Sequence, residues 1–96
     1  MSKLLYHDAA NDEVKAALRW YVARSPQKAR RLDSTLGRIL VEVLGRPDRY
    51  PPIDPEFREA AVPHFPYSVI YRVLPSGDVQ VIAHASRAPG YWRDRG

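Results

Sequence analysis

The pattern of apolar residues divides the chain into a helical first half and a strand-forming second half. Apolar residues recur at three- and four-residue spacings over residues 9–24 and again over 26–44, which predicts two amphipathic helices. The first stripe consists of Val14, Ala17, Leu18, Tyr21 and Val22, and the second of Ala29, Leu32, Leu36, Ile39, Leu40 and Val43. Because the link between them is short, we expect an antiparallel helical hairpin.

The helix ends carry their own signals. Asp8 is a candidate N-cap for the first helix, because its carboxylate can accept from the free N–H groups of the first turn. Ser25 followed by Pro26 predicts a stop and an immediate restart, with Ser25 as the second N-cap and Pro26 at the first helical position. Gly45 is expected to end the second helix, and Pro47 prevents it from resuming.

The second half has the composition of strands. Strands are predicted at residues 3–7, 57–62, 67–74 and 79–85, with a turn at 75–78 and a proline-rich loop at 46–56. The segment 67–74 is β-branched, aromatic and almost continuously apolar, which is typical of a central strand. "FPY" at 65–67 is expected to lead the chain into that strand with its rings in the core.

The hairpin turn also predicts a register. If Val73 lies opposite Val79, then Ile70 lies beside Ile82, and Arg72 and His84 share a face. The predicted fold is α+β, with the order β-α-α-β-β-β and the helical hairpin packed on one face of a small antiparallel sheet. The other face is left partly open, and residues 1–96 form one domain.

Composition narrows the function classes. The chain has 45% hydrophobic and 27% charged residues, which is ordinary for a globular domain. It has no cysteine, and its three histidines (His7, His64 and His84) form no ligand spacing, so neither a disulfide, a metal site nor a cofactor is expected. There is no signal-peptide pattern, and no apolar run approaches the roughly 18 residues of a membrane span, so a cytoplasmic location without a membrane partner is expected. The net charge of +4 favours acidic partners, although solubility alone also explains it.

Chemistry-bearing residues gather in "HASRAPGYW" at 84–92. His84 can act as an acid or base, or simply donate a hydrogen bond to the backbone at a strand end. Arg87 is a poor core residue, so it either pairs with an acid such as Glu59 or faces a partner. Tyr91 can stack on a base, but with Trp92 it can also cover the edge of the sheet.

Two further features lie on the predicted helices. Trp20 falls at the margin of the first stripe, where it either packs on the Pro51-Pro52 loop or contacts a partner. Arg31 and Arg38 lie on a basic outer face of the second helix, which is either a solvated surface or a binding surface.

Four stretches of this sequence resemble the RelE/ParE superfamily of toxins from bacterial toxin–antitoxin pairs, and most closely its ParE branch. They are "ALRWYVARSP", "ILVEVLGRPDRYPPI", "FREAAVPHFPYSVIYRV" and "HASRAPGYW", which together span almost the whole chain. The chain departs from the pattern at Ser86, where the branch usually has the first of two arginines.

The resemblance implies a toxin that poisons DNA gyrase by binding, and a cognate antitoxin that neutralises it with an extended or helical C-terminal segment. Operator DNA is then contacted only indirectly, through the antitoxin. On this basis we assign target binding to Arg58, Arg72, His84, Arg87 and Tyr91, and antitoxin binding to Trp20, Arg31 and Arg38.

RelE-like relatives instead cut messenger RNA on the ribosome, which is the alternative function. Here His84 would transfer protons, Arg72 and Arg87 would bind the phosphate, and Tyr91 would stack on a base. RelE-type sites carry lysines in the middle of the chain, whereas the only lysines here are Lys3, Lys15 and Lys28, and no acid is placed by the pattern. Gyrase binding is therefore preferred, and a degenerate toxin that only binds its antitoxin is a third possibility.

Overall fold

The computed structural model describes residues 3–85, without the side chains of Asp54 and of residues 83–85. The elements are β1 (Leu4–Tyr6), α1 (Asp8–Arg24), α2 (Pro26–Gly45), β2 (Pro52–Asp54), β3 (Phe57–Ala61), β4 (Tyr67–Val73) and β5 (Val79–Ala85). The two helices and four predicted strands are confirmed. The prediction that all of 46–56 is a loop is wrong, because this segment contains β2. This short edge strand pairs irregularly with β3. A proline is tolerated there because an edge strand leaves one side without hydrogen bonds.

The five strands form one mixed sheet in the order β1-β5-β4-β3-β2. The prediction of an antiparallel sheet is right for the four consecutive strands from β2 to β5, which tight connections force to alternate in direction. It is wrong for β1, which pairs with β5 in parallel. The chain passes through both helices and three strands between β1 and β5, so no turn ties their directions together.

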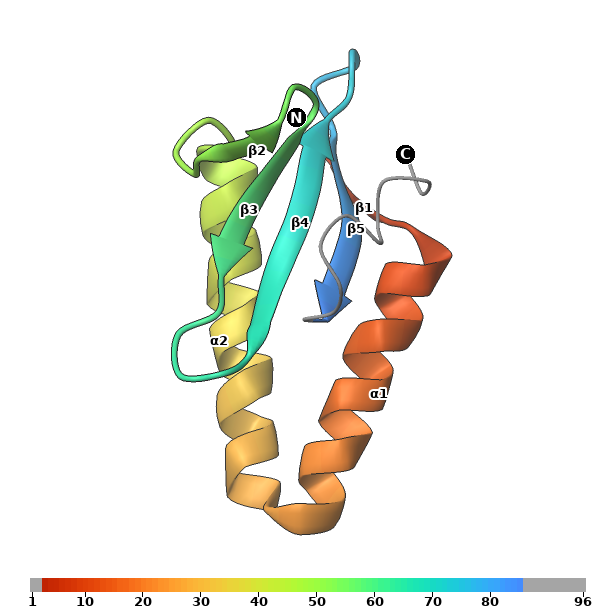
Figure 1. The fold of residues 1–96 in the computed structure, drawn as a ribbon, viewed down its shortest axis with the longest axis vertical. Helices are drawn as coiled ribbons and strands as arrows, with labels where there is room; N and C mark the ends of the chain where they lie inside the picture. Colours follow the sequence, from red (N-terminus) through yellow and green to blue (C-terminus); the bar gives the residue numbers. More distant parts are fainter. Residues whose placement is uncertain (1–2, 86–96) are drawn as a thin grey trace.

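The helices lie against one face of this sheet. In Figure 1, α2 passes behind β3 and β4, α1 runs beside β5, and the two helices meet at the end far from β2. Ser25 alone joins them: its N–H donates to the carbonyl of Tyr21 at 2.6 Å, and its Oγ accepts from the N–H of Lys28 at 3.3 Å. The predicted stop and restart at Ser25 is thus confirmed.

The predicted N-cap of α1 is wrong by one residue. His7 caps the helix, because its Nδ1 accepts from the N–H of Ala9 at 3.1 Å, while Asp8 lies in the first turn. The N–H of His7 still donates to the carbonyl of Val81 at 2.8 Å, continuing the pairing of β1. His7 is therefore extended, as an N-cap residue must be, and Asp8 is already helical.

The main core lies between the helices and the sheet. Its buried residues are Ala10, Leu32, Leu36, Ile39, Val43, Ala60, Val62, Val69, Tyr71, Val79 and Val81. The stripe predicted for α2 is confirmed, with Leu40 partly buried at its edge. In α1 the stripe is confirmed up to Tyr21, but Val22 is 56% exposed. The rings of Phe65 and Tyr67 are partly buried against this core.

A second, smaller cluster occupies the sheet face away from the helices. It contains Phe57, Ile70 and Ile82, all buried, so this face is not open at their positions. The predicted pairing of Val73 with Val79 is confirmed, but Ile70 pairs with Ala83 instead of Ile82. The register shifts on both sides of Ile70, which a count from the turn does not anticipate.

Candidate functional site

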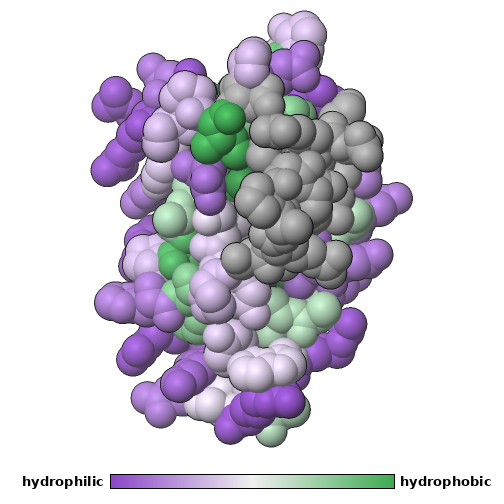
Figure 2. Space-filling model, viewed as in Figure 1, coloured by the Kyte–Doolittle hydropathy of each residue, from purple (hydrophilic) through white to green (hydrophobic). Residues whose placement is uncertain are grey.

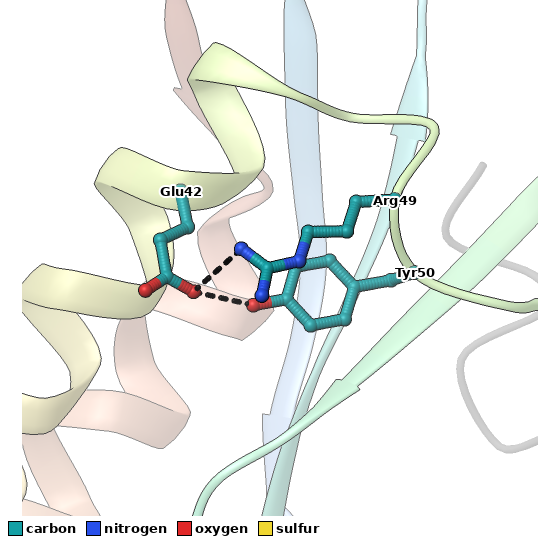
Figure 3. A network of polar contacts seen from close by, with 3 residues as sticks. All are labelled: Glu42, Arg49 and Tyr50. Atoms are coloured by element: carbon teal, nitrogen blue, oxygen red, sulfur yellow. Dashed lines mark hydrogen bonds and ion pairs between the residues drawn. The ribbon is translucent and has the colours of Figure 1, made fainter.

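The loop between α2 and β2 is held from both sides by polar contacts, and it forms one wall of the candidate site. On the helix side, the Tyr50 hydroxyl donates to Oε2 of Glu42 at 2.7 Å, and Nη1 of Arg49 lies 3.9 Å from the same oxygen (Figure 3). Desolvation, followed by the hydrogen bond to Glu42, raises the pKa of Tyr50 above its ordinary value. The phenol therefore stays protonated as the donor to this carboxylate.

On the sheet side, Tyr71 and Arg58 hold the same loop by its carbonyl groups. The Tyr71 hydroxyl donates to the carbonyl of Pro47, and Nη1 of Arg58 donates to the carbonyls of Tyr50 and Asp48. Burial raises the pKa of Tyr71 to about 12. Arg58, predicted to bind the target, is thus placed where it fixes the loop, and its target contact stays a prediction.

Arg72 lies on the sheet face away from the helices. Its Nε donates to Oε1 of Gln80 at 2.9 Å, directly across from it in β5, and its Nη1 lies 4.0 Å from Oε2 of Glu56. The Arg72 side chain is 22% exposed and that of Glu56 is 69% exposed, so this ion pair is reached by solvent. Gln80 fixes the direction of the guanidinium without neutralising its charge.

Arg58 and Arg72 line one pocket of about 800 Å³ at the end of β4. Its other walls come from the 47–57 segment, three of whose prolines line the pocket, and from residues 73–75. The acids Asp48 and Glu56 line it as well, so the two cations are balanced in number. The structure therefore brings together two of the five predicted target-binding residues.

The remaining predicted target residues are not tested. Arg87 and Tyr91, with Trp92, lie outside the described residues, and so does the side chain of His84, although its backbone belongs to β5. The set of four residues proposed for RNA cleavage is accordingly represented here by Arg72 alone.

The predicted antitoxin-binding residues lie on the helices. Arg31 and Arg38 are exposed on α2, seven residues apart and so on the same side of the helix. Trp20 is 50% exposed near the end of α1, with Cζ of Arg24 4.0 Å from its ring centroid. This end of α1 lies far from β2 in Figure 1, so the predicted packing of Trp20 on Pro51-Pro52 is wrong.

One feature of α1 escaped the sequence analysis. Glu13 is only 8% exposed, and it lines a pocket of about 400 Å³ together with Trp20, Tyr21 and Tyr67. A signal was present: Glu13, Ala17 and Tyr21 are spaced by four, so the acid lies on the apolar stripe.

The surface in the view of Figure 2 is mixed. Most of its outline is hydrophilic, and apolar colours appear as separate patches within it. Neither helix of the described part is long and apolar enough to cross a bilayer. Among the described side chains, which leave out those of Asp54 and His84, no three of the His, Cys, Asp or Glu type are arranged to bind a metal ion.

This arrangement of a helical hairpin on a mixed sheet has solved counterparts. A structure titled chromosomal ParDE TA system from P. aeruginosa superposes with a TM-score of 0.74 at 19% identity, covering 88% of this chain and 95% of the other. The isolated E. coli RelE toxin superposes with a TM-score of 0.61 at 20% identity, covering 98% and 95%. The fold is thus shared with these two structures, whose titles name a ParDE toxin–antitoxin system and the RelE toxin.

A comparison of the sequence with protein-family models identifies the family. The profile of the ParE toxin of the type II toxin–antitoxin system parDE matches residues 4–89, nearly the whole chain. The protein therefore belongs to the ParE toxin family. No curated protein matches it significantly.

Proposed function

We propose that this ParE-family toxin inhibits DNA gyrase by binding to it, and that a cognate antitoxin neutralises it in the cytoplasm. The observation that carries the proposal is the family match over residues 4–89, since ParE-like toxins are taken to act on gyrase. The structural likeness to a ParDE system supports it at the level of the fold.

The positions of the lysines favour binding over RNA cleavage. Lys15 and Lys28 are exposed on α1 and α2, and Lys3 precedes β1. All three therefore lie within the first 28 residues, whereas RelE-type sites carry lysines in the middle of the chain. A toxin that only docks has no need of a proton-transfer group, and its cations serve to recognise an acidic surface.

The pocket lined by Arg58 and Arg72 is the proposed target-binding surface. Arg72 is oriented by Gln80 and remains partly exposed, which suits an arginine that pairs with a carboxylate or phosphate of a partner. His84, Arg87 and Tyr91 complete this surface in the proposal.

RNA cleavage remains the second candidate because the fold also matches RelE. In that case Arg72 would bind the scissile phosphate, and His84, Arg87 and Tyr91 would supply the remaining roles. The orientation of Arg72 by Gln80 is compatible with either use.

The antitoxin is proposed to cover the helical hairpin, where Trp20, Arg31 and Arg38 are exposed. A disordered acidic segment that folds on binding suits such a surface, and the net charge of +4 speeds its docking. Contact with operator DNA belongs to the antitoxin in this proposal.

Expression in bacteria without a partner separates the candidates. Gyrase inhibition predicts filamentous cells, an induced DNA-damage response and altered plasmid supercoiling, all reversed by co-expression of the antitoxin. Ribosome-dependent cleavage predicts rapid translation arrest and codon-phased cuts in primer extension. The absence of any growth defect would support a degenerate toxin that binds only its antitoxin. Purified gyrase in a supercoiling assay, with the Arg72→Gln variant as control, tests direct binding.

A further inference from the structure

The pocket around Glu13 is built by the spacing of five residues on α1. Glu13, Ala16, Ala17, Trp20 and Tyr21 follow one another at three- and four-residue steps, so they share one side of the helix. Large side chains stand at both ends of this row, and alanines stand between them. The methyl side chains leave the space that makes the pocket.

The rest of the wall comes from the beginning of β4 and the residue before it. Tyr67, at the beginning of β4, and Pro66 face α1 across the pocket. The ring of Tyr21 meets that of Tyr67 edge-on, with centroids 6.4 Å apart and an interplanar angle of 83°. The ring of Trp20 meets Tyr21 in the same manner, at 4.9 Å and 79°. Three aromatic side chains thus line a pocket of about 400 Å³.

Such a set of rings attracts cations. The faces of aromatic rings carry negative electrostatic potential, and Trp attracts cations most strongly. Trp20 already holds one guanidinium, that of Arg24, with Cζ 4.0 Å from the ring centroid. The backbone carbonyl of Trp20 also accepts from Nη1 of Arg24 at 3.2 Å. This contact is a direct example of the recognition that the pocket offers.

Glu13 adds a negative charge at the same place. Glu13 as a residue is only 8% exposed, and it is the one acidic side chain among the described residues that line the pocket. A carboxylate offers about four acceptor positions, so it can receive a further donor in addition to the partners it already has. A buried carboxylate gains more from an approaching cation than an exposed one, because water screens the attraction less.

We propose that this pocket binds a single arginine or lysine side chain of the cognate antitoxin, with the cation against the wall formed by Trp20, Tyr21 and Tyr67 and its charge toward Glu13. The inference rests on the proposed neutralisation by an antitoxin. The net charge of +4 attracts acidic groups to the protein as a whole, whereas Glu13 and the rings make this pocket attract a basic group. The antitoxin is therefore expected to carry one basic anchor within an otherwise acidic segment.

Two observations favour the antitoxin over the toxin's target as the source of this cation. The pocket adjoins Trp20 on the helical hairpin, while the pocket lined by Arg72 lies at the other end of β4. Residues 67 and 72 of an extended strand are roughly 16 Å apart, at about 3.3 Å per residue. A nucleic acid is also a poor occupant, because its phosphates would be repelled by Glu13.

The first test measures cation binding by the free toxin. N-acetyl-arginine amide is titrated into the full chain, and the indole N–H resonance of Trp20, assigned from its loss in Trp20→Phe, is followed by NMR. We expect a saturable shift, roughly tenfold weaker with the neutral isostere N-acetyl-citrulline amide and in Glu13→Gln. The matched control is Asp12→Asn, which removes one exposed negative charge from the neighbouring position and should leave the affinity unchanged. Equal binding of arginine and citrulline would overturn the proposal.

The second test identifies the source. Peptides covering the C-terminal half of the cognate antitoxin are measured against the toxin by calorimetry, with each Arg or Lys replaced in turn by Gln. We expect one replacement to weaken binding at least tenfold in the wild type and to have little effect in Glu13→Gln. If no basic residue matters, the antitoxin is not the occupant. Should Glu13→Gln fail to fold, Trp20→Leu takes its place with the same expectation.

Neither measurement involves gyrase, so the two proposals fail separately. If the toxin inhibits gyrase but the Trp20 resonance does not shift on addition of the arginine derivative, only the proposed cation pocket is wrong. A toxin that cleaves RNA but binds a basic antitoxin anchor overturns only the proposed target.

Discussion

The hydroxyl of buried Tyr71 in β4 donates to the carbonyl of Pro47, which ties the centre of the sheet to the loop that follows α2. Tyr71→Phe removes the donor and leaves a partly buried carbonyl without this partner. We expect the free energy of unfolding to fall by about 1–3 kcal/mol, measured by urea denaturation. Tyr50→Phe removes the donor to Glu42, but the Glu42 carboxylate is partly exposed and keeps its ion pair with Arg49. Its free energy of unfolding should therefore fall less than that of Tyr71→Phe. Equal midpoints for Tyr71→Phe and the wild type would contradict this role.

The tyrosines also predict how stability depends on pH. Burial raises the pKa of both Tyr6 and Tyr71 to about 12, whereas the unfolded chain titrates near 10. The unfolded state therefore loses protons first, so the stability is fully present below pH 10 and is lost as the pH rises from 10 to 12. Urea unfolding at intervals from pH 8 to 11.5 measures this loss, and it should be shallower in Tyr6→Phe. A flat profile would show that neither phenol is protected by folding.

The two arginines of the pocket at the end of β4 should respond differently to substitution. Arg58→Ala releases two loop carbonyls, so we expect a loss of stability on the order of 1–3 kcal/mol together with any loss of toxicity. Arg72→Gln leaves Gln80 and the exposed Glu56 able to bind water, so toxicity should fall while the melting temperature stays within about 2 °C. Melting curves beside growth assays separate the two, and the reverse pattern would exchange their roles.

The link between the helices gives a further stability prediction. Ser25→Ala removes the Oγ that accepts from the N–H of Lys28, so it should destabilise the protein by about 1 kcal/mol. Ser34→Ala, at an exposed position inside α2, is the matched control, and should be neutral or slightly stabilising because alanine is the better helix former. Chemical denaturation of the pair measures the difference, and equal values would mean that the cap contributes nothing.

Gly37 offers a stabilising substitution. It lies exposed within α2, and a Cβ added there meets nothing within 4 Å. Gly37→Ala should raise the free energy of unfolding by about 0.5–1 kcal/mol, because alanine loses less backbone entropy in a helix. Thermal denaturation checks this. A decrease would mean that the helix needs the flexibility of glycine at this point.

Local patterns predicted the elements well because each depends on neighbours in sequence. The stripes of α1 and α2, the turn before Val79 and the stop at Ser25 are all of this kind. The parallel pairing of β1 depends on two segments more than seventy residues apart, and no local signal encodes it.

The candidate site was less predictable, because its contacts also join segments that are far apart in the sequence. Arg72 was placed correctly because it lies next to Val73, whose pairing with Val79 the turn predicts. The roles of Arg58 and Tyr71 depend on a proline-rich loop whose path only the folded chain defines. Glu13 was missed because the positive end of the helix dipole is enough to explain an acid near the beginning of a helix, whereas the fold gives it an aromatic surrounding.

Ser25 both terminates α1 and starts α2, so the link between the two helices is a single residue that is hydrogen-bonded to both of them. A change in the angle between the helices would break either the backbone hydrogen bond to Tyr21 or the N-cap hydrogen bond from Lys28. The hairpin therefore meets any macromolecule as a preformed, stiff template. Conformational adjustment during complex formation must then come almost entirely from whatever wraps around it.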